Sequence, residues 1–217
     1  MRAVAFLSLL FFVSCNPNSS TTPSGDSVNY TSGITRLMLY YPLDSTGANG
    51  EKLYRTIPDV ELTAQNGKPF HTNSVKGKIV VTDFFFASCQ GPCPRMTNQL
   101  TRVQQALRGD TNFRIVSYTV DPARDTANAL NEYALRFKAD TAQWKFITGD
   151  KKKLYDLARY SYFLPVDSGD GGPEDFIHSD QVILLDRDTH IRGYYSGTDS
   201  AAIDSLIVDI KTLLKQR

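Results

Sequence analysis

The hydrophobic pattern of this chain alternates between short apolar runs and longer amphipathic segments. Residues 79–86 are an almost continuous run of β-branched and aromatic side chains, interrupted by Asp83, which is typical of a buried parallel strand. In residues 96–107 the apolar side chains recur at helical spacing, and Gly109 is expected to end that helix. Residues 113–120 form a second apolar run. These segments predict a right-handed strand–helix–strand unit with parallel strands.

The same alternation continues along the chain and indicates the fold class. The predicted elements are a helix over residues 126–138, a strand over 144–147, a helix over 151–160, a hairpin over 181–196 and a last helix over 201–214. Ahead of them, Asn66-Gly67 is a turn signal between two short apolar segments and predicts an N-terminal β-hairpin. This order is typical of a thioredoxin-like α/β fold, with a central mixed sheet flanked by helices and extended by that hairpin.

The first fifteen residues have the pattern of an export signal. Arg2 supplies a short positive region, and residues 3–13 are apolar except for one serine. An apolar run of about eleven residues is too short to span a bilayer as a mature helix, so residues 1–15 are expected to be a signal peptide. The segment that ends at Ser14-Cys15 resembles the processing site of a bacterial lipoprotein, in which the cysteine becomes the acylated N-terminus. The alternative is an ordinary secretory signal that contains a cysteine.

The segment after this signal is expected to hold a domain away from a membrane. Residues 16–29 are mostly Asn, Pro, Ser, Thr and Gly, which is typical of a flexible tether. Residues 16–53 are therefore interpreted as a tether and extension, in which residues 37–41 favour one strand. The thioredoxin-like domain is expected over residues 54–217. With an acylated Cys15, the domain would lie on the extracytoplasmic side of a membrane, held by a lipid anchor.

The charge balance gives little indication of a charged partner. The chain has 24 Lys and Arg against 23 Asp and Glu, a formal net charge of +1. No basic face stands out in the sequence, so nothing favours a nucleic-acid partner. No segment after the signal is long and apolar enough to be transmembrane.

Two of the three cysteines, Cys89 and Cys93, lie where the first apolar strand gives way to a helix. Pro94 suits the first helical position, and the prolines that follow Gly91 and Cys93 bias this loop toward extended geometry. The N-terminal end of a helix is electropositive and lowers the pKa of a thiol, which favours the thiolate that binds metals or attacks disulfides. A static disulfide between the two cysteines is the simpler alternative.

Topology selects one of the three histidines as a partner for these thiols. The strand from Gln181 should run antiparallel to the first two strands and begin at the sheet edge where they end. His178 is therefore expected beside the cysteines, whereas His71 and His190 are expected to be ordinary surface histidines. Two thiolates and one imidazole form a soft, low-coordinate site that suits Cu(I), and copper also leads the affinity order of divalent metals. A structural zinc site would need a fourth ligand, and the sequence offers no obvious Cys or His.

Four segments make residues 57–215 resemble the Sco/SenC family of copper-binding, thioredoxin-fold proteins. They are the Phe-rich strand into Cys89-x3-Cys93-Pro94, the Val-Asp-Pro-Ala-Arg-Asp-Thr run of residues 120–126, His178-Ser179 before an apolar strand, and Ile57-Pro58-Asp59. The resemblance implies that Cys89, Cys93 and His178 bind copper, as Cu(I) or Cu(II). It also implies a role in delivering copper to, or reducing the cysteines of, the binuclear copper site of cytochrome c oxidase. The implied partners are the copper-site subunit of that oxidase and a thiol reductant protein.

Some residues of this chain differ from the usual family pattern. The cysteines enclose Gln90-Gly91-Pro92, and Ile177 stands where many members have Asp, with Asp175 and Asp180 nearby. A carboxylate that orients the histidine would then come from elsewhere. Asp121 would tune the site from the edge of the second strand, although its alternative as a turn residue before a proline is at least as well supported.

Two other functions remain as alternatives to a metallochaperone. In a general extracytoplasmic thiol–disulfide oxidoreductase, one cysteine attacks a partner disulfide and the other resolves it. The three-residue spacer counts against this reading, as does the lack of a Trp before Cys89 and of a Pro before Gln181. A thiol peroxidase is less favoured, because the peroxiredoxin pattern places Thr where this chain has Phe86. Thiol redox chemistry is expected to accompany copper transfer, since oxidised cysteines cannot bind the metal; enzymatic activity is left open.

Overall fold

The structure is a computed structural model that describes residues 43–50, 52–164, 169, 172 and 175–216. The predicted signal peptide, Cys15, the tether over residues 16–29 and the strand at residues 37–41 lie outside the described residues. Within the described residues, no helix is long and apolar enough to cross a membrane.

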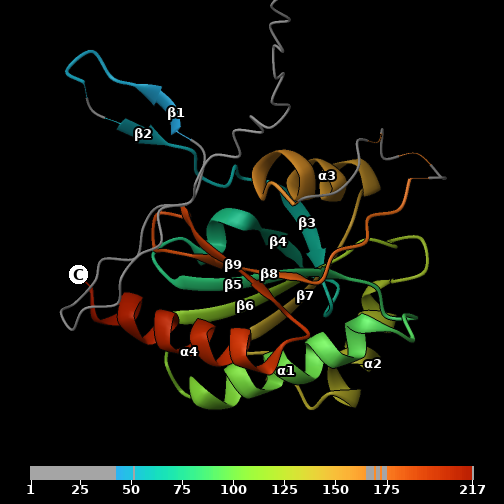
Figure 1. Cartoon of the computed structure of the whole chain (residues 1–217). Coiled ribbons are helices and arrows are strands. Elements are labelled where there is room, and N and C mark those ends of the chain that lie inside the picture. The colour runs from blue at the N-terminus through green and yellow to red at the C-terminus, as the bar shows by residue number, and fades with distance from the viewer. Residues whose placement is uncertain (1–42, 51, 165–168, 170–171, 173–174, 217) are drawn as a thin grey trace, which may run out of the picture. The chain divides into compact units, whose positions relative to one another are not determined.

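A mixed sheet of seven strands forms the centre of the described part of the chain (Figure 1). In chain order the strands are β3 (Glu61–Ala64), β4 (Pro69–His71), β5 (Ile79–Phe85), β6 (Phe113–Thr119), β7 (Trp144–Thr148), β8 (Gln181–Leu185) and β9 (Ile191–Ser196). Their spatial order is β4-β3-β7-β6-β5-β8-β9. The pairs β5–β6 and β6–β7 are parallel, and the other neighbouring pairs are antiparallel. The predicted thioredoxin-like α/β fold, including the hairpin of β3 and β4, is thus confirmed.

Helices cover both faces of this sheet because β5 buries side chains on both sides. The helices are α1 (Pro92–Ala106), α2 (Ala127–Arg136), α3 (Lys151–Asp156) and α4 (Ser200–Lys215). Val81 and Phe85 of β5 pack in one core with residues of α1, α2 and α4, whereas Val80 and Phe84 pack in a second core with residues of α3. Figure 1 shows α1 and α4 on one face and α3 on the other. The continuous apolar run predicted a strand buried on both faces, and β5 is buried at every position.

The register of β5 brings three chain segments to one edge of the sheet. Asp83 of β5 pairs with Ser117 of the parallel strand β6 and with Val182 of the antiparallel strand β8. The carboxyl ends of β5 and β6 therefore lie beside the start of β8. The sequence predicted this antiparallel arrangement, and it determines which side chains surround the strand-to-helix turn.

Two features differ from the hydrophobic pattern. Strands β1 (Leu43–Thr46) and β2 (Lys52–Tyr54) form a separate two-stranded antiparallel sheet, which was not predicted because few side chains there alternate clearly. The helix expected over residues 151–160 also changes character, because α3 ends at Asp156 and continues as a π-helix, Leu157–Ser161. There the N–H of Tyr162 donates to the carbonyl of Leu157, five residues earlier. Spacing of apolar residues does not distinguish such a wide turn from an α-helix.

Candidate metal centre

The turn from β5 into α1 places both cysteines at the sheet edge. Helix α1 begins at Pro92, with Gly91 before it as N-cap, so Pro92 takes the early position that the sequence assigned to Pro94. A proline in the first turn loses no hydrogen bond, because the first N–H groups of a helix have no partner within it. Cys93 is 4% exposed and Cys89 is half-buried, and both are free thiols. The structure therefore does not contain the disulfide between Cys89 and Cys93 that the sequence left as an alternative.

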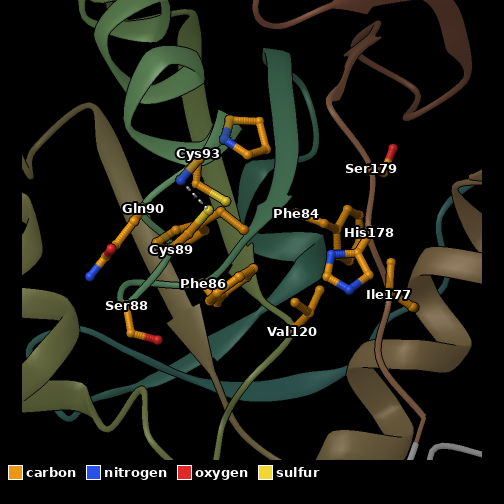
Figure 2. Close-up of a pocket in the computed structure, with 13 residues that line it drawn as sticks. Phe84, Phe86, Ser88, Cys89, Gln90, Cys93, Val120, Ile177, His178 and Ser179 are labelled. Carbon is orange, nitrogen blue, oxygen red and sulfur yellow. Dashed lines mark hydrogen bonds between the residues drawn. The ribbon is translucent and has the colours of Figure 1, made fainter.

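A pocket of about 280 Å³ lies at this edge and contains all three residues that the sequence singled out. It is lined by Phe84, Phe85, Phe86, Ser88, Cys89, Gln90, Gly91, Pro92, Cys93, Val120, Ile177, His178 and Ser179. Figure 2 shows the two sulfur atoms on one wall and the imidazole of His178 on the opposite wall. Long-range topology therefore brings residue 178 to the cysteines, as the antiparallel path of β8 predicted.

The two thiols differ in their tendency to ionise. Burial alone would raise the pKa of Cys89, but hydrogen bonds from the Cys93 thiol and from the N–H groups of Cys93 and Gly91 lower this pKa below its ordinary value. The Gly91 N–H donates to Cys89 Sγ at 3.4 Å. Burial raises the pKa of Cys93 to about 12, and its hydrogen bond to Cys89 adds to the rise. Cys89 is therefore the thiol that ionises first, and Cys93 retains its proton.

The imidazole of His178 is held by contacts with aromatic rings. Its ring centroid lies 4.9 Å from that of Phe176 and 6.4 Å from that of Phe86. None of the described residues forms a hydrogen bond with its side chain. Asp175 and Asp180, the two carboxylates near it in sequence, bind other partners instead. No carboxylate among the described residues therefore orients His178.

The three candidate ligands are near one another but do not form a closed group. Within the described ranges, the only set of three Cys, His, Asp or Glu side chains whose ligand atoms all lie within 4.8 Å is Asp186, Asp188 and His190. One ion can therefore contact both thiols and His178 only if at least one of these three side chains moves from its position in this structure. The set around Asp186 is explained by its turn, because Asp186 accepts hydrogen bonds from the N–H groups of Asp188 and His190 and from Arg192.

Asp121, which the family resemblance offered as a tuning residue, does not line the pocket. Its carboxylate accepts a hydrogen bond from Arg124 Nε at 2.6 Å, and its own N–H donates to Thr119 Oγ1 at 2.9 Å. Its carbonyl accepts from the N–H of Asp125. These contacts are typical of a turn residue, so they favour the interpretation of Asp121 as a turn residue before Pro122 over a role in tuning the site.

Asp83, which interrupts the apolar run of β5, does not line the pocket but acts on the Cys93 thiol through its charge. Its side chain is 1% exposed and accepts a hydrogen bond from Ser117, which in turn accepts one from Trp144 Nε1 at 2.8 Å. Burial raises the pKa of Asp83 to about 7, although the bond from Ser117 acts to lower it. A charge on Asp83 also raises the pKa of Cys93. A single acidic residue inside an otherwise apolar strand was the signal that could have identified it.

Comparison with known proteins relates this arrangement to one family. Residues 49–215 match the sequence pattern of the SCO1/SenC family. A SCO1 protein homolog of Bacillus subtilis is 28% identical over 183 residues, which cover 83% of this chain and 95% of that protein. A protein of Stutzerimonas stutzeri, named as copper-binding, is 31% identical over 144 residues, which cover 64% of this chain and 69% of that protein.

Solved structures give the same result. A SCO1/SenC family lipoprotein from Bacillus anthracis is 31% identical with a TM-score of 0.62, and the match covers 74% of this chain and 95% of that one. BsSco, described as having a disulfide switch and as a member of the Sco family of cytochrome c oxidase assembly proteins, is 27% identical with a TM-score of 0.64. That match covers 75% of this chain and 95% of BsSco.

Proposed function

This chain belongs to the SCO1/SenC family, and we propose that it binds copper through Cys89, Cys93 and His178. The observation that carries the proposal is that two free thiols and one imidazole line a single pocket at the carboxyl edge of the sheet. The copper-binding name of the Stutzerimonas stutzeri relative supports it.

The donor set fits copper in its chemistry. Thiolate sulfur is a soft ligand that selects Cu(I), and imidazole nitrogen also suits copper. Cys89 ionises first because its pKa is lowered, whereas Cys93 must lose a proton when the metal binds, so binding releases protons. The aromatic side chains of Phe84 and Phe86 line the same pocket and limit the water that competes for the ion. Copper is here the cargo of the protein.

The proposed role is in the assembly of cytochrome c oxidase, the process to which the description of BsSco assigns its family. In one form, copper passes to the binuclear copper site of the oxidase by exchange of ligands. In the other, Cys89 and Cys93 give two electrons and two protons to a disulfide of the copper-site subunit. A disulfide then forms between Cys89 and Cys93, the partner regains two thiols, and a thiol reductant protein restores the pair.

A general thiol–disulfide oxidoreductase is the second candidate function. The unequal thiols favour it, because a cysteine of lowered pKa attacks disulfides and a protonated neighbour resolves the mixed disulfide. This function has no need of His178, whereas the proposed copper site uses it as a third ligand.

We also propose that the mature chain is anchored by an acylated Cys15 on the extracytoplasmic side of a membrane. The description of the Bacillus anthracis relative as a lipoprotein supports this location. Membrane fractionation of the wild type and Cys15→Ser checks it. The wild type should be recovered with membranes and Cys15→Ser in the soluble fraction, and equal recovery of both with membranes would contradict the anchor.

Titration of the reduced full chain with copper tests the site. Cu(I) affinity is measured by competition with a chelator, and Cu(II) binding by visible absorption. We expect a one-to-one complex with thiolate-to-copper charge-transfer bands, which is lost in Cys89→Ala and weakened in His178→Ala. His190→Ala is the matched control, since His190 lies at the far end of β8 and outside the pocket.

Two results would count against this site. Copper that binds equally well to Cys89→Ala would refute the thiol pair as ligands. Weak binding that is indifferent to His178, together with catalytic turnover of protein disulfides, would favour the oxidoreductase.

A further inference from the structure

Asp175 begins the segment that carries His178, and its carboxylate is fixed by a buried ion pair. Arg159 donates two hydrogen bonds to it, at 2.7 and 2.6 Å, one to each oxygen. The two side chains are 8% and 10% exposed. Bidentate pairs of this kind fix geometry as well as charge, and removing one partner of a buried pair leaves the other charge without compensation. The start of the segment is therefore firmly held.

The backbone of Asp175 is tied to the wall of the pocket. Its carbonyl accepts hydrogen bonds from Lys151 Nζ at 2.6 Å and from the hydroxyl of Tyr155 at 3.1 Å. The hydroxyl has one proton, which it shares between this carbonyl and the closer carbonyl of Val120, at 2.8 Å; Val120 lines the pocket. Tyr155 thus connects the start of the His178 segment with the end of β6.

The other end of the segment is also held by a carboxylate. Asp180 accepts hydrogen bonds from Ser196 Oγ at 2.8 Å and Thr198 Oγ1 at 3.1 Å, and its carbonyl accepts one from the N–H of Gly197 at 2.7 Å. Between the two carboxylates, Ile177 is buried and His178 is exposed. The imidazole, which lies across the pocket from the two sulfur atoms in Figure 2, therefore projects from a short segment whose two ends are held by polar contacts.

Arg159 lies in an unusual piece of helix. It belongs to the π-helix Leu157–Ser161, and its guanidinium also lies over the ring of Tyr155, 5.3 Å from the centroid. π-Helices are rare and occur frequently at functional sites. The same residue that pairs with Asp175 thus packs on the tyrosine that binds the Asp175 carbonyl.

A metal-binding histidine is usually oriented by a hydrogen bond that its second ring N–H donates to a carboxylate, a backbone carbonyl or water. The described residues offer His178 no such bond, so its orientation depends on its contacts with the rings of Phe86 and Phe176 and on the backbone that carries it. We infer that Asp175, paired with Arg159, is a positioning residue for His178, with Asp180 holding the opposite end of the segment. This inference rests on the proposed role of His178 as a copper ligand.

The test uses the reduced full chain and two changes to the ion pair. Asp175→Asn removes the charge at nearly constant shape, and Arg159→Lys keeps the charge but loses the planar fork. We expect each to lower Cu(I) affinity by roughly 10-fold, the range found for residues that orient metal ligands. Asp156→Asn is the matched control, because Asp156 forms an exposed pair with Lys152 on the same helix. Its effect should stay within about 2-fold.

Two further readouts separate positioning from a structural role. In a His178→Ala background, Asp175→Asn should lower Cu(I) affinity by less than about 2-fold, because its effect passes through the imidazole. In NMR spectra of the copper-free protein labelled at histidine, Asp175→Asn should shift or broaden the His178 signals and leave those of His71 and His190 unchanged.

The outcomes for the two proposals are distinct. An equal loss of affinity in both backgrounds, or unchanged His178 signals, would overturn the positioning role. Absence of tight copper binding in the wild type would overturn the proposed function, and the NMR comparison would still decide whether Asp175 orients His178. A variant that unfolds is recognised from its spectrum, and Arg159→Lys then supplies the answer.

Discussion

The two walls of the pocket are held in place by different means. The cysteine wall is part of the core: Cys93 packs in one hydrophobic cluster with Phe85 and Met96, both about 1% exposed. The histidine wall is a segment in which His178 is exposed, held by an ion pair at one end and hydroxyl groups at the other. The cysteine wall is thus held by packing in the core, whereas the position of the exposed imidazole depends on polar contacts at the two ends of its segment.

Loss of a ligand from each wall should give the largest contrast. Cys89→Ser removes a thiolate from the fixed wall, and we expect Cu(I) affinity to fall by more than about 100-fold, beyond the range for residues that only orient a ligand. His178→Ala should cost less, roughly 10-fold, because two thiolates can still hold Cu(I). Competition with a Cu(I) chelator measures both. Equal losses would show that the imidazole is as essential as a thiolate and would remove the distinction between the walls.

A pH dependence of stability is expected from Asp83 of β5, the strand that leads into the cysteine turn. The pKa of Asp83 is raised by burial from 3.8 to about 7 in the folded state. The folded protein therefore binds a proton on Asp83 more tightly than the unfolded chain does. The stability gained from this proton is fully present below about pH 4 and is lost as the pH rises toward 7. The loss should be on the order of a few kcal/mol in the free energy of unfolding.

Asp83→Asn cannot titrate and is the variant that checks this expectation. Urea unfolding at several pH values should show a smaller decrease in the free energy of unfolding for Asp83→Asn than for the wild type between about pH 4 and pH 7. Parallel curves for the two proteins would mean that Asp83 is not responsible. Asp156→Asn, an exposed carboxylate on α3, serves as the control and should follow the wild type.

Most of the sheet and the cysteine turn could be predicted from sequence because local patterns encode them. The apolar run over residues 79–86 and the prolines around Cys93 specify structure only within a few residues of where they stand. His178 was placed by a rule of topology, the antiparallel path of β8, which needs only the strand order. The contact between Arg159 and Asp175 could not be predicted, since it depends on a π-helix that apolar spacing does not reveal. The hairpin of β1 and β2 was missed because its strands have little alternation to detect.

The reactivity of the thiols should reveal the asymmetry within the cysteine wall. Because the pKa of Cys89 is lowered and that of Cys93 is raised, alkylation by iodoacetamide should modify Cys89 first, at a lower pH than an ordinary thiol. Cys93→Ala removes the hydrogen bond that the Cys93 thiol gives to Cys89, so the pH midpoint of Cys89 alkylation should rise. Mass spectrometry of the alkylated peptide measures this midpoint. A midpoint that stays unchanged in Cys93→Ala would indicate that the backbone N–H groups alone lower the pKa of Cys89.

The smallest effect is expected at the far anchor of the histidine wall. Asp180 is partly exposed and accepts its side-chain bonds from two hydroxyl groups, each worth about 1 kcal/mol net, whereas Asp175 sits in a buried charged pair. Its carbonyl bond to Gly197 also survives a change of side chain. Both side-chain bonds go to the same oxygen, Asp180 Oδ2, and the amide oxygen in Asp180→Asn can still accept them, so Cu(I) affinity should fall by only about 2-fold, less than in Asp175→Asn. The same chelator competition ranks the two variants. A larger loss of affinity in Asp180→Asn than in Asp175→Asn would mean that the Asp180 end of the segment, and not the buried ion pair of Asp175, sets the position of His178. Asp180 would then be the firmly held end of the segment and Asp175 the loosely held one.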